Sequence, residues 1–501
     1  MVKFIEIANQ NPWWKYGDSF HIFDPNLLTF QNQKIKIDRR RLDLKKGDIG
    51  IIRGCRQIGK TTYMKRLVQR LIADGIESRK ILYLSVDRFV SRREFRNAVD
   101  DFLRRNRDAD EVYILLDEIT AIKEWNLELK RLSDSGITQR ARVLVTGSSG
   151  AALRGMGEQL PGRGLEGNEY YMRPLSFREF IFQTMRVFES WSKSNELSQA
   201  LQILETTLKE TWLTLAEDFD EIADRLDRIL PFKSELEYLF EHYLRGGGFP
   251  IAINPYFDNT MIKEKEDFFE PEVVEVFVRT VLGELNKHGK SEATARQILK
   301  AIIDRYGTRF SFNNLANDLT ITHVTTGDYL DFLENSFILS ILYAYDFNKK
   351  DLKQKGSKKV YFQDPFIFYS MKSALTGAVI NDVIKEALEN EDMISEIIEG
   401  IVASHLTMSM ETPYLKERNT FLWFYYDTRG KEIDNVLMRD GRYLGIEVKY
   451  QSDVGPRDVT RVQEIDNYLI LSKNDVVKTD DTYVVPVEAF LSVLEMSKHN
   501  L

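Results

Sequence analysis

The first 180 residues alternate between short apolar runs and amphipathic stretches. The apolar run at residues 48–54 predicts a buried strand. Apolar residues then recur at three- and four-residue spacing as far as Asp74-Gly75, which predicts an amphipathic helix after a glycine-containing loop. The residues on that spacing are Met64, Leu67, Val68, Leu71 and Ile72.

Further apolar runs lie at residues 81–87, 112–116 and 141–147. Strands that alternate with helices form a parallel sheet with helices on both faces. Ligands of such sheets bind at the carboxyl ends of the strands. We therefore expect the polar residues that follow these runs to lie near one another at one edge of the sheet.

The middle of the chain is helical and charged. Apolar residues recur at helical spacing from about Asn195 to Tyr243, among many charged side chains. We interpret residues 181–255 as a helical lid.

A helix-turn-helix pattern follows the lid. Residues 313–318 predict a short helix, and residues 323–335 predict a second helix. Two strand-like segments come next, at residues 337–345 and 359–364. This order is typical of a winged helix, which we assign to residues 256–365. The expected core contacts of the second helix are Val324, Tyr329, Leu330 and Leu333.

The segment between these two strands is rich in lysine. A lysine-rich wing suits a nucleic-acid phosphate backbone. A winged helix that docks a protein, with the lysines in a solvated loop, explains the same pattern equally well. The lysines are Lys349, Lys350, Lys353, Lys355, Lys358 and Lys359.

The last 140 residues contain a strand-like segment at residues 443–450 whose side chains alternate in character. Alternation places Glu447 and Lys449 on one face of the strand. A turn at Asp440-Gly441 folds the preceding strand back, so that Asp434 comes beside them. Two carboxylates can hold Mg²⁺, and a nearby lysine can orient a water for phosphodiester cleavage. A surface hairpin with an ion pair is the simpler alternative.

Composition limits the classes of protein that fit. The 501 residues are 43% hydrophobic and 29% charged, as in a globular protein of about three domains. A net charge of −8 is no nucleic-acid signature for the whole chain, so any such contact must come from local patches. The single cysteine, Cys55, allows no internal disulfide. With no membrane-spanning segment or signal peptide in view, we expect a cytoplasmic protein without membrane contact.

The loop after the first strand carries the phosphate-binding pattern G-x-x-x-x-G-K-[ST]. Glycines let successive backbone N–H groups point at phosphate oxygens, and the following helix adds its dipole. Lys60 would approach the β and γ phosphates of ATP, and the Thr61 hydroxyl would bind Mg²⁺. The expected nucleotide-binding residues are Gly54, Cys55, Arg56, Gln57, Ile58, Gly59, Lys60, Thr61, Thr62 and Ser148.

A second acidic position follows the strand at residues 112–116. Asp117 would contribute to the Mg²⁺ site, and Glu118 would polarise the attacking water. The strand at residues 141–147 brings Thr146 and Ser148 to the same edge, where a hydroxyl could sense the γ-phosphate. Small polar residues after a strand are also common turn formers.

Several segments together resemble the AAA+ ATPases that are common in archaea and also occur in bacteria. They are NPWW, GCRQIGKTT, LLDEI, TGSS and LPGRG with YYMRPLSFREF. This chain has Cys55 where such proteins usually have proline. The resemblance implies that Arg163 reaches a γ-phosphate, either of its own nucleotide or of a neighbouring copy's, and the second case implies self-association. From the residues alone, Arg163 is an exposed cation in a glycine-rich loop.

The order D…E-x-K at Asp434, Glu447 and Lys449 resembles the PD-(D/E)xK nucleases, which have a restriction-endonuclease-like fold. Such domains often begin with a helix that carries a metal-facing glutamate. The segment IIEGIVASHL matches that helix, so the resemblance implies Glu399 as a further metal ligand. A nuclease fold that no longer cuts would show the same residues.

Together these patterns predict an α/β protein. We expect a P-loop ATPase core at residues 1–180, then the lid and the winged helix, and a nuclease-like domain at residues 366–501. The expected function is ATP hydrolysis that acts on or near nucleic acid. The alternative is a signalling or defence switch whose C-terminal domain binds a protein without cutting DNA. The trigger, the substrate and the oligomeric state are left open.

Overall fold

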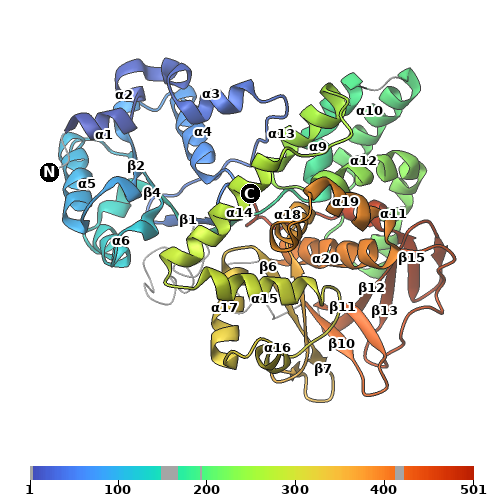
Figure 1. Ribbon diagram of the computed structural model, residues 1–501. Helices are drawn as coiled ribbons and strands as arrows, with labels where there is room; N and C mark the ends of the chain where they lie inside the picture. Colours follow the sequence, from blue (N-terminus) through green and yellow to red (C-terminus); the bar gives the residue numbers. More distant parts are fainter. Residues whose placement is uncertain (1–3, 148–167, 192–193, 412–421, 440) are drawn as a thin grey trace. The chain divides into compact units, whose positions relative to one another are not determined.

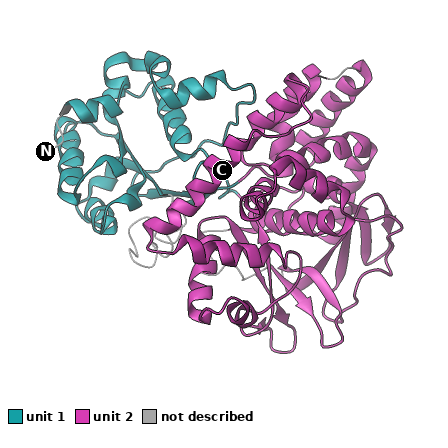
Figure 2. Ribbon diagram, viewed as in Figure 1, with its two compact units in different colours: residues 1–173, 412–416, 498–501 teal, residues 174–411, 417–497 magenta. Residues whose placement is uncertain are grey.

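The computed structural model describes residues 4–147, 168–191, 194–411, 422–439 and 441–501 (Figure 1). The chain divides into two compact units (Figure 2). Unit 1 contains residues 1–173, 412–416 and 498–501, and unit 2 contains residues 174–411 and 417–497.

The sheet of unit 1 is parallel throughout, in the order β2-β3-β4-β1-β5. Apolar strands that are buried on both faces are characteristic of parallel sheets, and β1 and β3 are buried at every position. The strands are β1 (Ile49–Gly54), β2 (Ile81–Ser85), β3 (Val112–Asp117), β4 (Ala141–Gly147) and β5 (Glu169–Met172).

Helices cover both faces of this sheet. The buried sides of α5 and α6 form one apolar cluster with one face of the strands, and α4 lies on the other face (Figure 1). The helix predicted after the phosphate loop is α4, and it ends at Ala73 as expected. The helices of unit 1 are α1 (Phe4–Gln10), α2 (Trp13–Tyr16), α3 (Pro25–Asn32), α4 (Lys60–Ala73), α5 (Arg92–Arg105) and α6 (Trp125–Asp134).

The N-terminal segment covers the free edge of β2 with side chains. The Asn11 amide donates to the Tyr83 carbonyl at 2.9 Å and accepts from the Tyr83 N–H at 2.7 Å. The indoles of Trp13 and Trp14 both donate to the Ile81 carbonyl, at 3.0 and 2.8 Å. These side chains replace the neighbouring strand that an edge strand lacks, which gives the NPWW segment a structural role.

The last residues of the chain cover the opposite edge of the sheet. The Tyr171 N–H in β5 donates to the His499 carbonyl at 2.7 Å, and the Leu501 N–H donates to the Tyr171 carbonyl at 2.9 Å. The buried guanidinium of Arg39 donates to the Leu501 carbonyl at 2.7 Å. Residues 498–501 therefore belong to unit 1, although the sequence placed them with the C-terminal domain.

Unit 2 begins with helices in the region that was predicted to be a lid. Three of these helices, α9, α11 and α12, pack against the C-terminal helix α21 (Val487–Val493). The helices are α9 (Phe177–Trp191), α10 (Asn195–Glu210), α11 (Phe219–Ile229), α12 (Lys233–Gly246), α13 (Pro250–Phe257) and α14 (Pro271–Lys287).

The helix-turn-helix and wing follow in the predicted order. Phe310 and Lys358 exchange backbone hydrogen bonds at 3.0 and 2.8 Å, which form an isolated antiparallel bridge beside the β6–β9 pair. The prediction for Val324 is wrong, because this side chain is 59% exposed and Thr326 takes the inward position. The elements are α15 (Glu292–Ile303), α16 (Phe312–Asp318), α17 (His323–Asn335), β6 (Leu339–Tyr343), β7 (Tyr345–Asp346), β8 (Asp351–Leu352) and β9 (Lys358–Phe362).

A mixed six-stranded sheet forms the last part of unit 2, in the order β10-β11-β12-β13-β15-β14. The predicted hairpin is β11–β12, in which Asn435 pairs with Ile446. The remaining elements are α18 (Pro365–Thr376), α19 (Ile380–Glu389), α20 (Glu391–Met410), β10 (Leu422–Tyr426), β11 (Glu432–Arg439), β12 (Arg442–Lys449), β13 (Asn467–Ser472), β14 (Val477–Lys478) and β15 (Thr482–Pro486).

The predicted fold class is confirmed: a parallel P-loop-type sheet with helices precedes a helical region, and a mixed α/β domain ends the chain. The lid, the winged helix and the C-terminal sheet form one compact unit, so the boundaries at residues 255/256 and 365/366 stay predictions.

Substituting Asn11 tests how the edge of β2 is covered. Asn11→Ala leaves a buried N–H and a buried C=O of Tyr83 without partners, so we expect the free energy of unfolding of unit 1 to fall by about 2 kcal/mol or more. Urea denaturation measures this change. Asn9→Ala, an exposed change in the preceding helix α1, is the control and should have little effect. Equal stability of the two variants would contradict the proposed role of Asn11.

Candidate functional site

The phosphate loop joins β1 to α4 in unit 1, and two of its glycines have no substitute. A Cβ at Gly54 would lie 2.4 Å from the Met172 carbonyl oxygen. Gly59 adopts a φ of +100°, which side chains rarely allow. The pattern of glycines therefore follows from the backbone path that turns the N–H groups of the loop inward.

The charged and hydroxyl groups of the loop lie where the motif predicts. The Lys60 ammonium is buried and donates to the carbonyl oxygens of Gly54 and Cys55, both at 2.9 Å. The Thr61 hydroxyl donates to Asp117 Oδ2 at 2.6 Å. A threonine hydroxyl beside a carboxylate is an oxygen donor set that suits Mg²⁺. These residues of β1, α4 and β3 thus fit the cofactor that the motif implies.

Asp117 accepts hydrogen bonds from three hydroxyl groups, and two of these were not assigned to it from the sequence. The Tyr83 hydroxyl on β2 donates to Asp117 Oδ2 at 2.8 Å. The Thr146 hydroxyl on β4 donates to Asp117 Oδ1. Burial and the neighbouring Asp117 carboxylate raise the pKa of Tyr83, so its hydroxyl stays a donor. Because β2, β3 and β4 are adjacent, their carboxyl ends meet at this point.

Glu118 has a left-handed backbone, with φ of 54° and ψ of 44°. A non-glycine residue in this region is uncommon and is often found at functional sites. The Glu118 N–H donates to the Thr146 hydroxyl at 3.2 Å, which holds the turn after β3. The position is consistent with the catalytic role predicted for Glu118, and that role stays a prediction.

The other nucleotide-binding residues nominated from the sequence lie on the same loop. Cys55 and Ile58 are buried, and Arg56, Gln57 and Thr62 are half-buried. Ser148 and Arg163 lie outside the described residues, so the predicted γ-phosphate contact and the implied self-association stay predictions.

A buried lysine lies against the ring of Tyr83. The Lys65 ammonium on α4 lies 3.8 Å from the centre of the Tyr83 ring and 5.0 Å from that of Trp13. It pairs with Asp24 at 3.3 Å, and burial lowers its pKa. The spacing of apolar residues along α4 does not predict this contact, because a lysine that points inward interrupts the apolar pattern.

In unit 2, the structure brings together the four residues predicted at the C-terminal site. Asp434 Oδ2 accepts from the Val448 N–H at 2.9 Å, and Glu447 Oε2 accepts from the Asp434 N–H at 3.3 Å. The Lys449 ammonium pairs with Glu447 at 2.8 Å. The alternation of β12 thus aims Glu447 and Lys449 the same way, as predicted.

A fifth residue, Lys359 on β9, lies among these carboxylates. Its ammonium contacts Glu399 Oε1 at 2.5 Å and Asp434 Oδ1 at 2.9 Å, and it also pairs with Glu432. The Tyr361 hydroxyl, two residues along the same strand, donates to Glu399 Oε1. Lys359 and Tyr361 are two residues apart, which in a strand places both side chains on one face. That spacing was the sequence signal for this contact, and it was overlooked because Lys359 follows a run of lysines.

The protonation preferences follow from burial and from these contacts. Burial and the nearby Asp434 carboxylate raise the pKa of Glu399 to about 8, and the same causes raise that of Glu447 to about 8. Although burial opposes it, the Lys359 ammonium holds the pKa of Asp434 below its usual value. Despite burial, the surrounding acids raise the pKa of Lys359 well above its ordinary value.

The cluster does not fit a metal ion in this arrangement. Within the described ranges, no group of three or more His, Cys, Asp or Glu side chains could hold one. Lys359 supplies the positive charge that the acids need. The assignment of Glu399, Asp434 and Glu447 as metal ligands therefore stays a prediction.

Of the six lysines predicted on or near the wing, two are buried and so cannot contact a phosphate backbone. Lys358 and Lys359 are buried, because they lie in β9 and not in the loop. The Lys353 ammonium is half-buried and donates to the Tyr426 carbonyl at 3.0 Å. Lys349, Lys350 and Lys355 are exposed.

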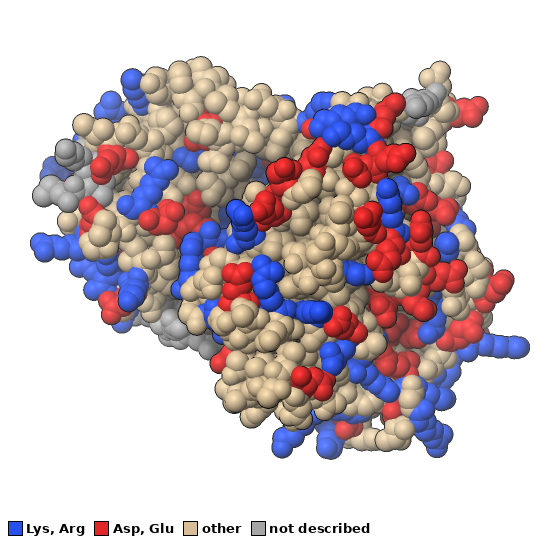
Figure 3. All heavy atoms as spheres, in the orientation of Figure 1, with Lys and Arg blue, Asp and Glu red and all other residues tan. Residues whose placement is uncertain are grey.

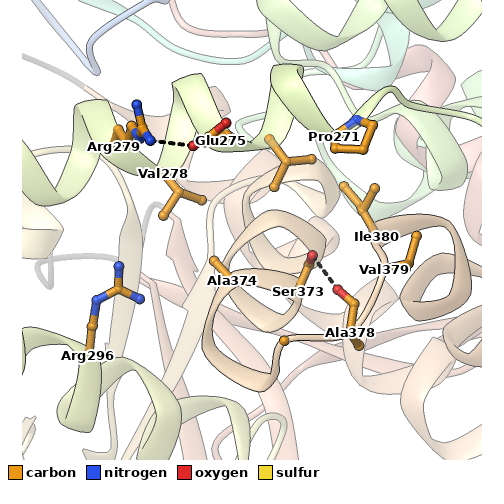
Figure 4. A pocket seen from close by; sticks show the side chains of 12 residues that line it. Pro271, Glu275, Val278, Arg279, Arg296, Ser373, Ala374, Ala378, Val379 and Ile380 are labelled. Atoms are coloured by element: carbon orange, nitrogen blue, oxygen red, sulfur yellow. Dashed lines mark hydrogen bonds and ion pairs between the residues drawn. The ribbon is translucent and has the colours of Figure 1, made fainter.

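A hollow of about 450 Å³ lies elsewhere in unit 2, among α14, α15 and the turn between α18 and α19 (Figure 4). Val278, Val379 and Ile380 line it, and Arg279 at its rim pairs with Glu275 at 2.5 Å. None of the residues predicted from the sequence lines this hollow.

Acidic and basic side chains of the described residues are interspersed on the face drawn in Figure 3, without one continuous basic surface in that view. No helix in the described part of the chain has the length and apolar character needed to cross a bilayer.

Comparison with known proteins supports the first site. Residues 46–181 match a family model described as an AAA domain. Residues 237–377 and 395–494 match two domains of unknown function, DUF8612 and DUF4143. The predicted P-loop ATPase resemblance is thus confirmed as an AAA-type ATPase domain, a class that generally binds ATP and Mg²⁺.

Relatives along much of the chain come from archaea and bacteria. The chain is 27% identical over 390 residues to "Uncharacterized protein MJ1637" of Methanocaldococcus jannaschii, which covers 76% of this chain and 72% of that protein. It is 24% identical over 325 residues to an "Uncharacterized protein" of Haemophilus influenzae, covering 62% of this chain and 66% of that protein.

Tyr83→Phe tests whether the hydroxyl on β2 positions Asp117 for Mg²⁺. Loss of a group that orients a metal-site carboxylate typically costs about 10-fold or more in metal affinity. We expect the Mg²⁺ concentration for half-maximal ATP turnover to rise by roughly that factor, with a smaller effect on the maximal rate. Turnover assays across Mg²⁺ concentrations measure it.

Tyr63→Phe is the matched control, because its buried hydroxyl bonds backbone groups at Arg40 and Leu42 and not Asp117. If both variants shift the Mg²⁺ requirement alike, Tyr83 is a structural residue only.

Proposed function

We propose that this chain is a nucleotide-dependent switch. ATP is bound and hydrolysed in the AAA-type domain, and unit 2 binds a protein partner without cutting DNA. The observation that supports the nucleotide half is the contact of Thr61 with Asp117 at 2.6 Å, beside the buried Lys60 ammonium.

The chemistry at this site follows from the groups present. Lys60 and the inward N–H groups of the loop bind the phosphates, and Thr61 with Asp117 would hold Mg²⁺. The bound cation would neutralise charge on the β and γ phosphates. Tyr83 and Thr146 orient Asp117, and Glu118 takes up the proton of the attacking water.

The charge of the second helix of the helix-turn-helix favours a protein partner. The sequence of α17 contains no lysine or arginine, and Asp328 and Asp331 on it are exposed. An acidic helix is repelled by a phosphate backbone. The exposed Val324 on the same helix offers an apolar contact of the kind that protein interfaces use.

A second candidate function is action on nucleic acid through the loop between β7 and β9. Lys349, Lys350 and Lys355 are exposed there and could contact phosphates. Asp346 and Asp351 lie in the same segment and reduce its net positive charge.

Glu118→Gln tests the division of roles at the nucleotide site. The variant keeps the shape of the side chain and removes the base, so we expect ATP to bind normally and the hydrolysis rate to fall by about 100-fold or more. Fluorescent-nucleotide binding and phosphate release measure the two steps.

Lys60→Ala is the comparison variant and should lose both steps, with a cost in binding of about 2–3 kcal/mol. Loss of ATP binding in Glu118→Gln would show that Glu118 is structural.

DNA separates the two candidate functions. For a protein-binding switch, we expect ATP turnover to be the same with and without single- or double-stranded DNA. A variant with Lys349, Lys350 and Lys355 all changed to Gln should then behave like the wild type. If instead DNA stimulates turnover, and the triple variant weakens binding and lowers the salt slope by about one per lost contact, the nucleic-acid function replaces this proposal.

A further inference from the structure

Lys359 uses its whole hydrogen-bonding capacity on carboxylates. An ammonium group has three N–H donors and no acceptor. The Lys359 ammonium contacts three different acids: Glu399 at 2.5 Å, Asp434 at 2.9 Å, and Glu432. Only 3% of its side chain is exposed, so these acids take the place of bulk water around the ammonium.

Asp434 and Glu447 also accept hydrogen bonds from other groups. Asp434 Oδ2 accepts from the Val448 N–H, and Glu447 accepts from the Lys449 ammonium and the Asp434 N–H. A metal ion that bound here would compete with these donors for the carboxylate oxygens. It would also have to displace a buried cation.

Charge balance in the cluster is nearly complete without a metal. The four acids are Glu399, Glu432, Asp434 and Glu447. They face the cations Lys359, Lys449 and Arg309, the last of which lies 3.3 Å from Glu432. A divalent ion added to this set would bring two further positive charges beside the buried Lys359 ammonium.

The neighbouring lysine on the same strand shows that burial alone does not explain Lys359. The Lys358 ammonium is also buried, but it donates to the backbone carbonyls of Gln354 and Gly356. Its side chain lies near the rings of Phe312 and Tyr343, and it has no carboxylate partner among the contacts described.

We propose that Lys359 is the resident cation of this carboxylate cluster and that it excludes divalent metal ions from it. The cluster contains carboxylates of the kind that a metal-dependent phosphodiesterase uses, and a side chain of the same chain takes the metal's place. The inference concerns unit 2 alone and does not depend on the nucleotide site.

Mn²⁺ binding to the full-length chain without nucleotide tests this proposal, with calorimetry or electron paramagnetic resonance as the readout. Asp434→Asn identifies binding at the cluster. We expect wild-type protein to show no Mn²⁺ binding that this substitution removes. Lys359→Met should gain one Mn²⁺ per chain, and the double variant Lys359→Met with Asp434→Asn should lose it. Lys358→Met removes a buried ammonium without touching the acids, and it should gain none.

Thermal unfolding gives a second readout. Lys359→Met should melt at a lower temperature than the wild type, and Mn²⁺ should restore part of the loss, with no such effect on Lys358→Met. Supercoiled plasmid should stay uncut by the wild type in Mn²⁺.

An Asp434-dependent Mn²⁺ site in the wild type overturns the proposal, as does a folded Lys359→Met variant that gains no site. If Lys359→Met does not fold, Lys359→Arg preserves the charge and should remain free of Mn²⁺. Asp434-dependent Mn²⁺ binding to that variant would also overturn the proposal. ATP turnover in the same samples tests the nucleotide site separately.

Discussion

The buried ammonium of Lys359 is the contact on which the C-terminal half of the chain depends. It joins β9 to Glu399 of α20 and to Asp434 of β11, three segments that are far apart in the sequence. Several buried carboxylates repel one another unless a cation lies among them. Removing one partner of such a buried set typically costs about 3–5 kcal/mol, since the remaining charges lose their compensation. The stability of β9, α20 and β11 therefore depends in part on this one cation.

In unit 1, the polar groups that need partners are the backbone N–H and C=O groups at the edges of the sheet. A parallel sheet has two edges with unpaired backbone groups, and this chain covers one with Asn11, Trp13 and Trp14 and the other with residues 499–501. Covering the edge of β2 also holds Tyr83 in place, and Tyr83 contacts Asp117 at the nucleotide site. The NPWW segment thus covers the edge of the sheet and also helps to position a residue of the predicted Mg²⁺ site.

The residues that were predicted well are those whose function requires a short continuous stretch. The phosphate loop, Asp117 and the helix at residues 323–335 all lie where local pattern places them. Val324 was misplaced because the inward stripe of α17 continues through Thr326, a polar residue that the apolar pattern does not reveal. Lys358 and Lys359 were counted with the wing lysines because a lysine-rich composition gives the charge of the segment. It does not give the direction of each side chain on β9.

By itself, the sequence determined the order of elements, the phosphate loop with its acidic partner, and the alternation that aims Glu447 and Lys449 together. Each strand, helix and motif depends on neighbours within about 20 residues, where backbone geometry decides the outcome. Asp117 was expected near the phosphate loop because both follow strands of one parallel sheet. Only the tertiary structure decided that Tyr83 supports Asp117, that the last four residues join unit 1, and that Lys359 lies among the C-terminal acids. Those contacts join segments whose partners are set by the packing of whole sheets and helices, and no local pattern records such pairings.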